Sequence, residues 1–220
     1  MLVVDDHPVV RTGVRSLLAD AADVEVVGEA CDGRQAIAAA ERHNPDVVLM
    51  DLRMPDLGGV EATRRILEAR PGTAVVILTG PNAEDDVVAA LEAGALGYLA
   101  KSAPRSDFLA ALRTVRRGEA WLPAALTRRI LGRLRPAASE PAVEALTPRE
   151  LEVFELLASG LANGEIADRL GIAEITVRTH VSHLFAKLGV SNRVQAALHA
   201  WRRGLVPPQA TEPEAGKGAG

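Results

Sequence analysis

Short apolar runs alternate with longer amphipathic stretches across the first 117 residues, and this alternation constrains the fold more than any other feature. The short runs are rich in Val, Ile and Leu, whereas the longer stretches repeat apolar residues every three or four positions, as on one face of a helix. Such alternation is typical of a doubly wound α/β domain with a parallel sheet. The predicted strands are Leu2–Val4, Val24–Gly28, Val47–Met50, Ala74–Leu78 and Gly97–Ala100, and the predicted helices are Val9–Ala19, Gln35–Arg42, Val60–Arg70, Glu84–Ala93 and Ser106–Arg117.

Polar side chains follow four of these five apolar runs. Asp5 and Asp6 come after the first, Asp51 after the third, Thr79 after the fourth and Lys101 after the fifth. In an open parallel sheet, ligands bind at the carboxyl ends of the strands, so we expect these groups to converge. Three carboxylates at one edge predict a site that binds a hard cation and leaves one carboxylate available as a nucleophile.

A second region with a helical pattern begins at Leu146. Thr147, Pro148 and Glu150 form the signature of a helix start, because Thr can cap, Pro suits the first position and Glu completes a capping box. The turn around Gly171 is as short as that of a helix-turn-helix. The four predicted helices are Pro148–Ala158, Gly164–Leu170, Glu174–Leu188 and Arg193–Arg203.

The net charge of −4 is unevenly distributed. Residues 1–104 hold nine Lys and Arg against seventeen Asp and Glu, residues 105–135 hold eight against two, and residues 145–206 hold seven against six. A polyanionic partner is therefore expected to bind the second half of the chain. We predict a first domain at 1–117, a linker at 118–144 with a short basic helix within Leu122–Leu134, a second domain at 145–206 and a disordered tail at 207–220.

Three further features of the sequence predict a cytoplasmic protein with no membrane segment. No apolar run reaches about 18 residues, the length that a spanning helix needs. The amino terminus reaches Asp5 without the basic and apolar regions of a secretory signal. Cys31 is the single cysteine, which fits a reducing compartment.

The strand-end set of Asp5, Asp6, Asp51, Thr79 and Lys101 closely resembles the receiver domain of bacterial two-component response regulators. Residues Leu146–Val206 resemble the LuxR-type helix-turn-helix of the same proteins. The chain is thus identified as similar to the NarL/FixJ family over almost its whole predicted ordered length. This resemblance implies a flavodoxin-like receiver with a five-stranded parallel sheet, followed by an all-α DNA-binding domain.

The resemblance also implies roles for individual residues of the first domain. Asp51 would be the phosphoacceptor, with Lys101 and Thr79 contacting the phosphoryl oxygens. Tyr98 would be the aromatic switch residue that moves with Thr79. The implied cofactor is Mg²⁺, held by Asp6, Asp51 and the carbonyl of Arg53, with Asp5 acting through water.

In the second domain, the resemblance makes Glu174–Leu188 the recognition helix. Its implied base-reading residues are Arg178, Thr179 and Ser182, with His183 at the margin, and its implied phosphate contacts are Thr176, Lys187, Asn163 and Arg169. Val177, Val181, Leu184 and Leu188 recur every three or four residues. They are therefore predicted to pack this helix onto the rest of its domain.

These observations predict a transcription factor, not an enzyme, that a sensor histidine kinase switches by phosphorylation. The predicted partners are the kinase, double-stranded promoter DNA and a second copy of the chain once phosphorylated, with RNA polymerase as a further candidate. Two alternatives stay open: a DNA-binding regulator that is constitutive or controlled by another signal, and a phosphatase or phosphate-relay module whose second domain only binds protein. A nucleotide-binding domain is disfavoured because no Gly-x-Gly-x-x-Gly or Walker-type lysine follows any predicted strand.

Overall fold

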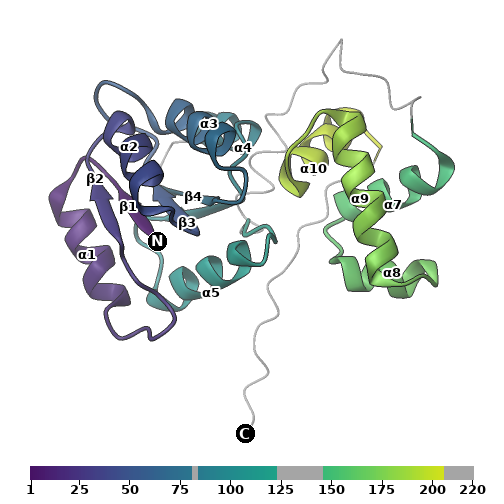
Figure 1. Ribbon diagram of the computed structural model, residues 1–220, viewed down its shortest axis with the longest axis horizontal. Coiled ribbons are helices and arrows are strands. Elements are labelled where there is room, and N and C mark those ends of the chain that lie inside the picture. The colour runs from purple at the N-terminus through teal and green to yellow at the C-terminus, as the bar shows by residue number, and fades with distance from the viewer. Residues whose placement is uncertain (81–83, 123–145, 206–220) are drawn as a thin grey trace, which may run out of the picture. The chain divides into compact units, whose positions relative to one another are not determined.

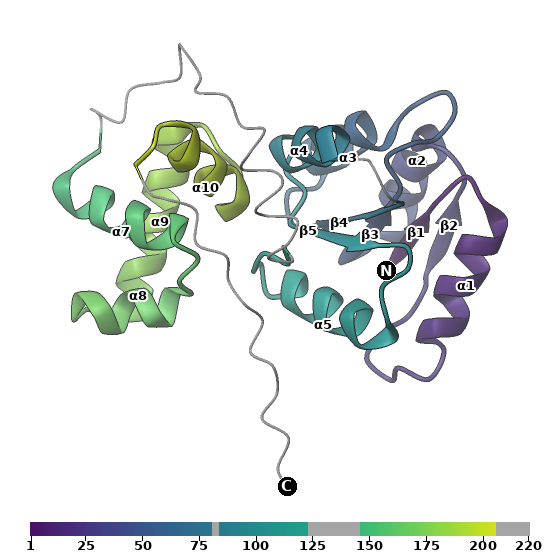
Figure 2. The same ribbon diagram turned by 180° about the vertical axis from the view of Figure 1, so that it is seen from behind.

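The computed structural model describes residues 1–80, 84–122 and 146–205 (Figures 1 and 2). The chain divides into an N-terminal unit, Met1–Leu122, and a C-terminal unit, Pro123–Gly220, and each is described by itself. The basic helix predicted within Leu122–Leu134, most of the predicted linker and the predicted tail lie outside the described residues. Within the described ranges, no helix combines the length and apolarity that crossing a membrane requires.

The N-terminal unit is a five-stranded parallel sheet in the order β2-β1-β3-β4-β5, which confirms the predicted α/β fold. Figure 1 shows α2, α3 and α4 on one side of the sheet and α5 on the other. The strands are β1 (Leu2–Val4), β2 (Gly28–Ala30), β3 (Val47–Met50), β4 (Ala74–Thr79) and β5 (Gly97–Ala100), and the helices are α1 (Pro8–Leu18), α2 (Gly33–His43), α3 (Gly59–Ala69), α4 (Glu84–Glu92) and α5 (Arg105–Arg116).

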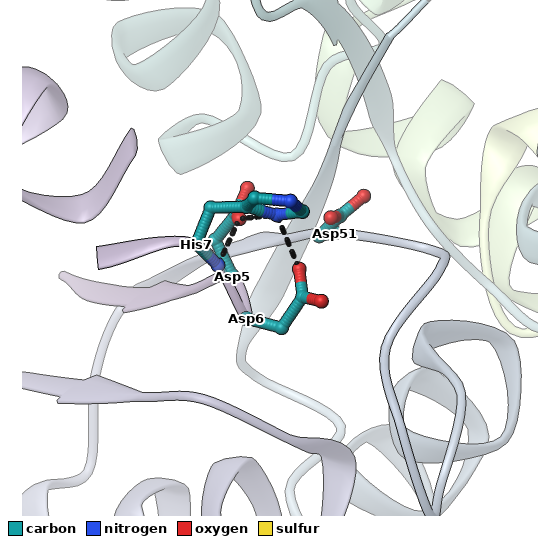
Figure 3. Close-up of side chains that lie close together, drawn as sticks. All are labelled: Asp5, Asp6, His7 and Asp51. Carbon is teal, nitrogen blue, oxygen red and sulfur yellow. Dashed lines mark hydrogen bonds and ion pairs between the residues drawn. The ribbon is translucent and has the colours of Figure 1, made fainter. Parts of the chain in front are cut away.

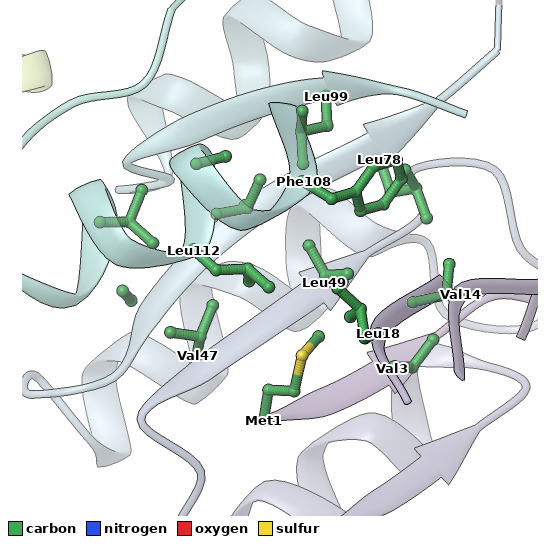
Figure 4. Close-up of a cluster of buried hydrophobic side chains, with 14 residues drawn as sticks. Met1, Val3, Val14, Leu18, Val47, Leu49, Leu78, Leu99, Phe108 and Leu112 are labelled. Atoms are coloured by element: carbon green, nitrogen blue, oxygen red, sulfur yellow. The ribbon is translucent and has the colours of Figure 1, made fainter. Parts of the chain in front are cut away.

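A buried apolar cluster fixes α1 and α5 to one face of the sheet (Figure 4). Side chains alternate between the two faces of a strand, so every second residue of the central strands enters this cluster. Its members include Val3, Leu49, Val76 and Leu99 from the strands, with Leu18 and Phe108 from the two helices. Leu2, Val4, Val48, Met50, Val75 and Ile77 of the central strands are also buried, as expected for a parallel sheet covered on both faces.

The predicted strand Val24–Gly28 is wrong, because the second strand is Gly28–Ala30. The first strand has only three residues, and its Leu2 pairs with Gly28, so the ladder begins there. Val24 instead donates its backbone N–H to Ala21 within a turn. Val24 and Val26 pack against the apolar cluster from outside the ladder, which explains their apolar pattern.

Residues after α5 continue to pack on the sheet. The Trp121 carbonyl accepts the Tyr98 N–H at 2.9 Å, and the Trp121 N–H donates to the Leu96 carbonyl at 3.0 Å. The N-terminal unit therefore extends past residue 117, the predicted end of the first domain. Most other predicted element ends agree with the structure to within one or two residues.

The C-terminal unit holds four helices in its described part: α7 (Pro148–Ala158), α8 (Asn163–Leu170), α9 (Glu174–Leu188) and α10 (Arg193–Arg202). The predicted capping box is present, since Thr147 and Glu150 hydrogen-bond reciprocally at the start of α7. Gly171 adopts a left-handed conformation, with φ of 64°, and ends α8. Val177, Leu184 and Leu188 of α9 are buried in the apolar cluster of this unit and Val181 packs against it, as the spacing predicts.

Candidate functional site

The polar groups that follow β1, β3 and β5 converge on one edge of the sheet. In the order β2-β1-β3, the second strand lies on one side of β1 and the third strand on the other. The strand order therefore reverses between β1 and β3, which is where ligands bind in open α/β sheets. Asp5 and Asp51 are both buried there. The Lys101 ammonium lies 2.6 Å from Asp5 Oδ2 and 2.7 Å from Asp51 Oδ2, so one cation bridges carboxylates from two strands.

Burial sets the electrostatics of Asp51. Removal from water raises the pKa of its carboxyl group, and the charge of Asp5 acts in the same direction. The hydrogen bond from Lys101 and the Leu52 N–H, which donates to Asp51 Oδ1 at 2.8 Å, oppose this rise. The two carboxylates in turn raise the pKa of Lys101 although its partial burial acts against this. Lys101 thus stays charged and partly offsets two buried acids.

Asp6 and His7 complete a group of potential metal ligands with Asp5 and Asp51 (Figure 3). One ligand atom from each residue lies within 4.8 Å of all the others, a spacing that a single ion could bridge. The ring atom His7 Nδ1 lies 2.6 Å from Asp6 Oδ1, and the backbone N–H of His7 donates to Asp5 Oδ1 at 2.9 Å. Sequence reasoning missed His7, although its place directly after the two acids and before the helix-starting Pro8 was a usable signal.

The loop after β3 is held by close backbone packing. A methyl group at Gly59, the first residue of α3, would overlap the carbonyl oxygen of Asp51. Only glycine therefore allows the helix to start this near the candidate site. Arg53 lies in the same loop, and its side chain pairs with Asp86 of α4 at 2.9 Å. The predicted metal ligand is the backbone carbonyl of Arg53. The ion pair involves only the side chain, so this ligand stays a prediction.

Thr79 and Tyr98 lie on the neighbouring strands β4 and β5. Thr79 is the last residue of β4 and pairs in register with Ala100, while Tyr98 pairs with Ile77. Tyr98 is half-buried. The Thr79 side chain lies outside the described part of the structure, so its predicted contact with a phosphoryl group stays a prediction.

In the C-terminal unit, the predicted base-reading residues share the exposed side of α9. Arg178, Thr179, Ser182 and His183 are all exposed, whereas Val177, Leu184 and Leu188 are buried. Each of the first three residues bonds within the helix: Arg178 pairs with Glu174 at 2.6 Å, and the Thr179 and Ser182 hydroxyls donate to Ile175 and Arg178 carbonyls. These local bonds leave the side chains on the helix surface.

The predicted phosphate contacts divide into two kinds. Thr176 and Arg169 are exposed and Asn163, at the start of α8, is half-buried. Lys187 is different, because its ammonium lies 2.6 Å from Oε2 of Glu150, a carboxylate that is only 5% exposed. The hydrogen bond from Lys187, together with that from the Thr147 N–H, lowers the pKa of Glu150 to about 2. Lys187 thus forms an ion pair within its own domain, a contact that the sequence analysis did not predict.

Comparisons with known proteins match a separate family to each unit of the chain. Residues 1–113 match the response regulator receiver domain, and residues 144–200 match the luxR family of bacterial regulatory proteins. The nitrate/nitrite response regulator protein NarL of Escherichia coli (strain K12) is 44% identical over 200 residues, or 90% of this chain and 93% of NarL.

Two solved structures extend these similarities. The crystal structure of the response regulator ChrA of a heme-sensing two-component system is 40% identical, covers 93% of this chain and 96% of ChrA, and has a TM-score of 0.52. A structure of two RcsB dimers bound to two parallel DNAs is 27% identical, covers 90% of this chain and 96% of RcsB, and has a TM-score of 0.55. The similarity to each of these proteins therefore includes both units.

Proposed function

This chain belongs to the NarL/FixJ family of two-component response regulators, as its sequence predicts, and from that premise we propose that phosphorylation of Asp51 switches its binding to DNA. One observation carries the proposal: Asp51 is a buried strand-end carboxylate in contact with Lys101, in a chain that also presents an exposed polar face on a recognition helix. Neither alternative, a constitutive regulator or a relay module, explains both features.

The chemistry proposed for Asp51 is attack on the phosphohistidine of a sensor histidine kinase. One carboxylate oxygen forms a P–O bond as the P–N bond breaks, and the histidine nitrogen leaves with the electron pair. Lys101 already contacts Asp51 Oδ2, so its ammonium is placed to bind the oxygens of the arriving phosphoryl group. Thr79 is proposed to donate a hydrogen bond to the same group.

The acidic cluster fits a divalent cation. The carboxylates of Asp5, Asp6 and Asp51 lie close together, and the Lys101 ammonium contacts only those of Asp5 and Asp51, so the cluster holds more negative than positive charge. Its oxygen donors are those that Mg²⁺ prefers. We propose that Asp6, Asp51 and the Arg53 carbonyl hold this ion and that Asp5 acts through water. When bound, Mg²⁺ would offset the charge of the carboxylates and the phosphoryl group.

The proposed signal leaves the site through β4 and β5. Thr79 and Tyr98 lie on these paired strands, so a shift of Thr79 toward a phosphoryl group can be accompanied by movement of the half-buried Tyr98 ring. A phosphoryl group adds nearly two negative charges at one point, enough to bias a two-state element. We propose that the changed surface favours a homodimer that binds paired DNA half-sites in the cytoplasm.

Intact-mass measurement after incubation with acetyl phosphate and Mg²⁺ tests this proposal. The wild-type chain should gain one phosphate, a chelator should prevent the gain, and Asp51→Asn should not be labelled. Asp56→Asn is the matched control, since Asp56 is exposed in the same loop and its φ of 62° suits asparagine. Equal labelling of Asp51→Asn and wild type would show that another group accepts the phosphoryl group.

A further inference from the structure

Ile175 is one of two large hydrophobic residues that stand out as exposed in the described part of the chain, and it lies on the recognition helix. Its side chain is 68% exposed. It is the second residue of α9 and is absent from the apolar cluster that holds this domain together. The fold of the domain therefore gives no reason for an isoleucine at this position.

The position of Ile175 on α9 places it in line with the predicted base-reading residues. It precedes Arg178 by three residues, Thr179 by four and Ser182 by seven, and residues at these spacings share one face of a helix. The hydrogen bond from the Thr179 hydroxyl to the Ile175 carbonyl, at 3.1 Å, is consistent with that alignment. Ile175 thus lies on the same face as these predicted base-reading residues and nearer the start of the helix, the end that contacts base edges in helix-turn-helix proteins.

The chemistry of the DNA major groove indicates what an apolar side chain would contact there. The edges of the bases in that groove carry hydrogen-bond donors and acceptors, and thymine alone adds an apolar group, its C5-methyl. An isoleucine in the groove cannot form hydrogen bonds, so it can favour a base only by packing against this methyl group. The exposed surface of Ile175 would then be removed from water in the complex, which favours binding.

We propose that Ile175 is a specificity-determining residue that packs against the methyl group of a thymine in each half-site. This inference rests on the proposed DNA binding and adds a base preference to it. Ile175 lies three residues, or about 4.5 Å along the helix axis, from Arg178. Successive base pairs are about 3.4 Å apart, so this thymine lies within about two base pairs of the base that Arg178 contacts.

Replacement of single thymines by deoxyuridine tests the proposal, because this change removes only the methyl group. A preferred duplex is first selected with the phosphorylated full-length chain, and each thymine is then replaced in turn. Wild type should lose about three- to tenfold in affinity at one thymine of each half-site. The Ile175→Ser variant should bind the thymine and deoxyuridine duplexes equally at that position, while Ile175→Val should keep most of the preference.

Several outcomes would overturn the proposal. One is the same deoxyuridine penalty at every position in wild type and Ile175→Ser, and another is the absence of any penalty in wild type. A third is unchanged DNA binding in Ile175→Ser combined with altered self-association in sedimentation, which would assign this residue to a protein contact. Failure of the proposed function looks different, because wild type would then select no preferred duplex at all. Unfolding curves should show equal stability of the variants, since Ile175 lies outside the apolar cluster.

Discussion

Replacement of Lys187 by Met should destabilise the C-terminal unit in the absence of DNA. The Lys187 ammonium donates to Glu150 Oε2 at 2.6 Å, and the same oxygen accepts the N–H and hydroxyl of Thr147. A hydrogen bond to a charged group contributes about 1.5–3 kcal/mol. The Lys187 side chain is 36% exposed, so solvent screening lowers our expectation to about 1–2 kcal/mol. In a domain of this size, that loss corresponds to a fall in Tm of roughly 4–16 °C.

Urea unfolding of the full-length chain can measure this loss within one unit. The chain has two tryptophans, so a Trp121→Phe background leaves Trp201 as the fluorescent reporter. Its indole N–H donates to the Ala158 carbonyl at 3.1 Å, which ties the signal to the packing of this domain. Arg169→Met is the matched control, because Arg169 is an exposed cation on α8 and its replacement should change stability by less than about 0.5 kcal/mol.

The effect of Lys187→Met should depend on pH in a defined direction. The pKa of Glu150 is lowered from 4.5 to about 2, mainly by Lys187, so the folded state keeps the carboxylate charged. Stability from such a group is present above the pKa of the unfolded chain and is lost as pH falls through that of the folded chain. The difference between wild type and Lys187→Met should therefore be complete at pH 7 and shrink between about pH 4.5 and 2. Equal stability at pH 7 would refute the structural role and return Lys187 to the predicted phosphate contacts.

Two further pairs of variants test the candidate sites. Gly59→Ala should destabilise the N-terminal unit by about 1–3 kcal/mol and slow labelling of Asp51, because the methyl group overlaps the Asp51 carbonyl. Gly13→Ala in α1 should stabilise the N-terminal unit by about 0.5–1 kcal/mol, because the added methyl group would meet no atom within 4 Å outside its own stretch of helix. Equal unfolding curves for Gly59→Ala and Gly13→Ala would contradict the packing argument. Arg178→Ala should cost about 1–3 kcal/mol of preference for a selected duplex over a scrambled one, measured at two salt concentrations. Arg169→Ala should weaken binding to both duplexes alike and lower the slope of log affinity against log salt concentration by about one. The same pattern in Arg178→Ala would make Arg178 a phosphate contact.

The convergence of Asp5, Asp51 and Lys101 at one edge was predictable because it depends on the direction and order of the strands. Asp5, Asp51 and Lys101 each follow a short apolar strand, and parallel strands end at the same edge. Distances between these groups did not need to be known for the site to be recognised. The family resemblance added the order of the residues and their roles.

Features that depend on how elements meet were not predictable in the same way. The extent of β2 follows from the three-residue length of its partner β1. The apolar residues Val24 and Val26 pack against the buried cluster without belonging to the strand. The Lys187–Glu150 contact joins residues 37 apart in the chain and depends on how α7 and α9 pack. A lysine late in a recognition helix predicts a phosphate contact from sequence alone, because nothing in the local pattern places a buried carboxylate beside it.

Charge balance distinguishes the Lys187 site from the Lys101 site and supports the switch proposed for the latter. At Glu150, one ammonium meets one carboxylate, and the same carboxylate oxygen already accepts three hydrogen bonds. That arrangement is complete, so it stabilises one conformation. At Asp51, a single ammonium contacts two of three neighbouring carboxylates, so negative charge stays in excess until a further cation binds. A phosphoryl group arriving there changes the charge and competes for Lys101, and rearrangement of the surrounding contacts is the expected response.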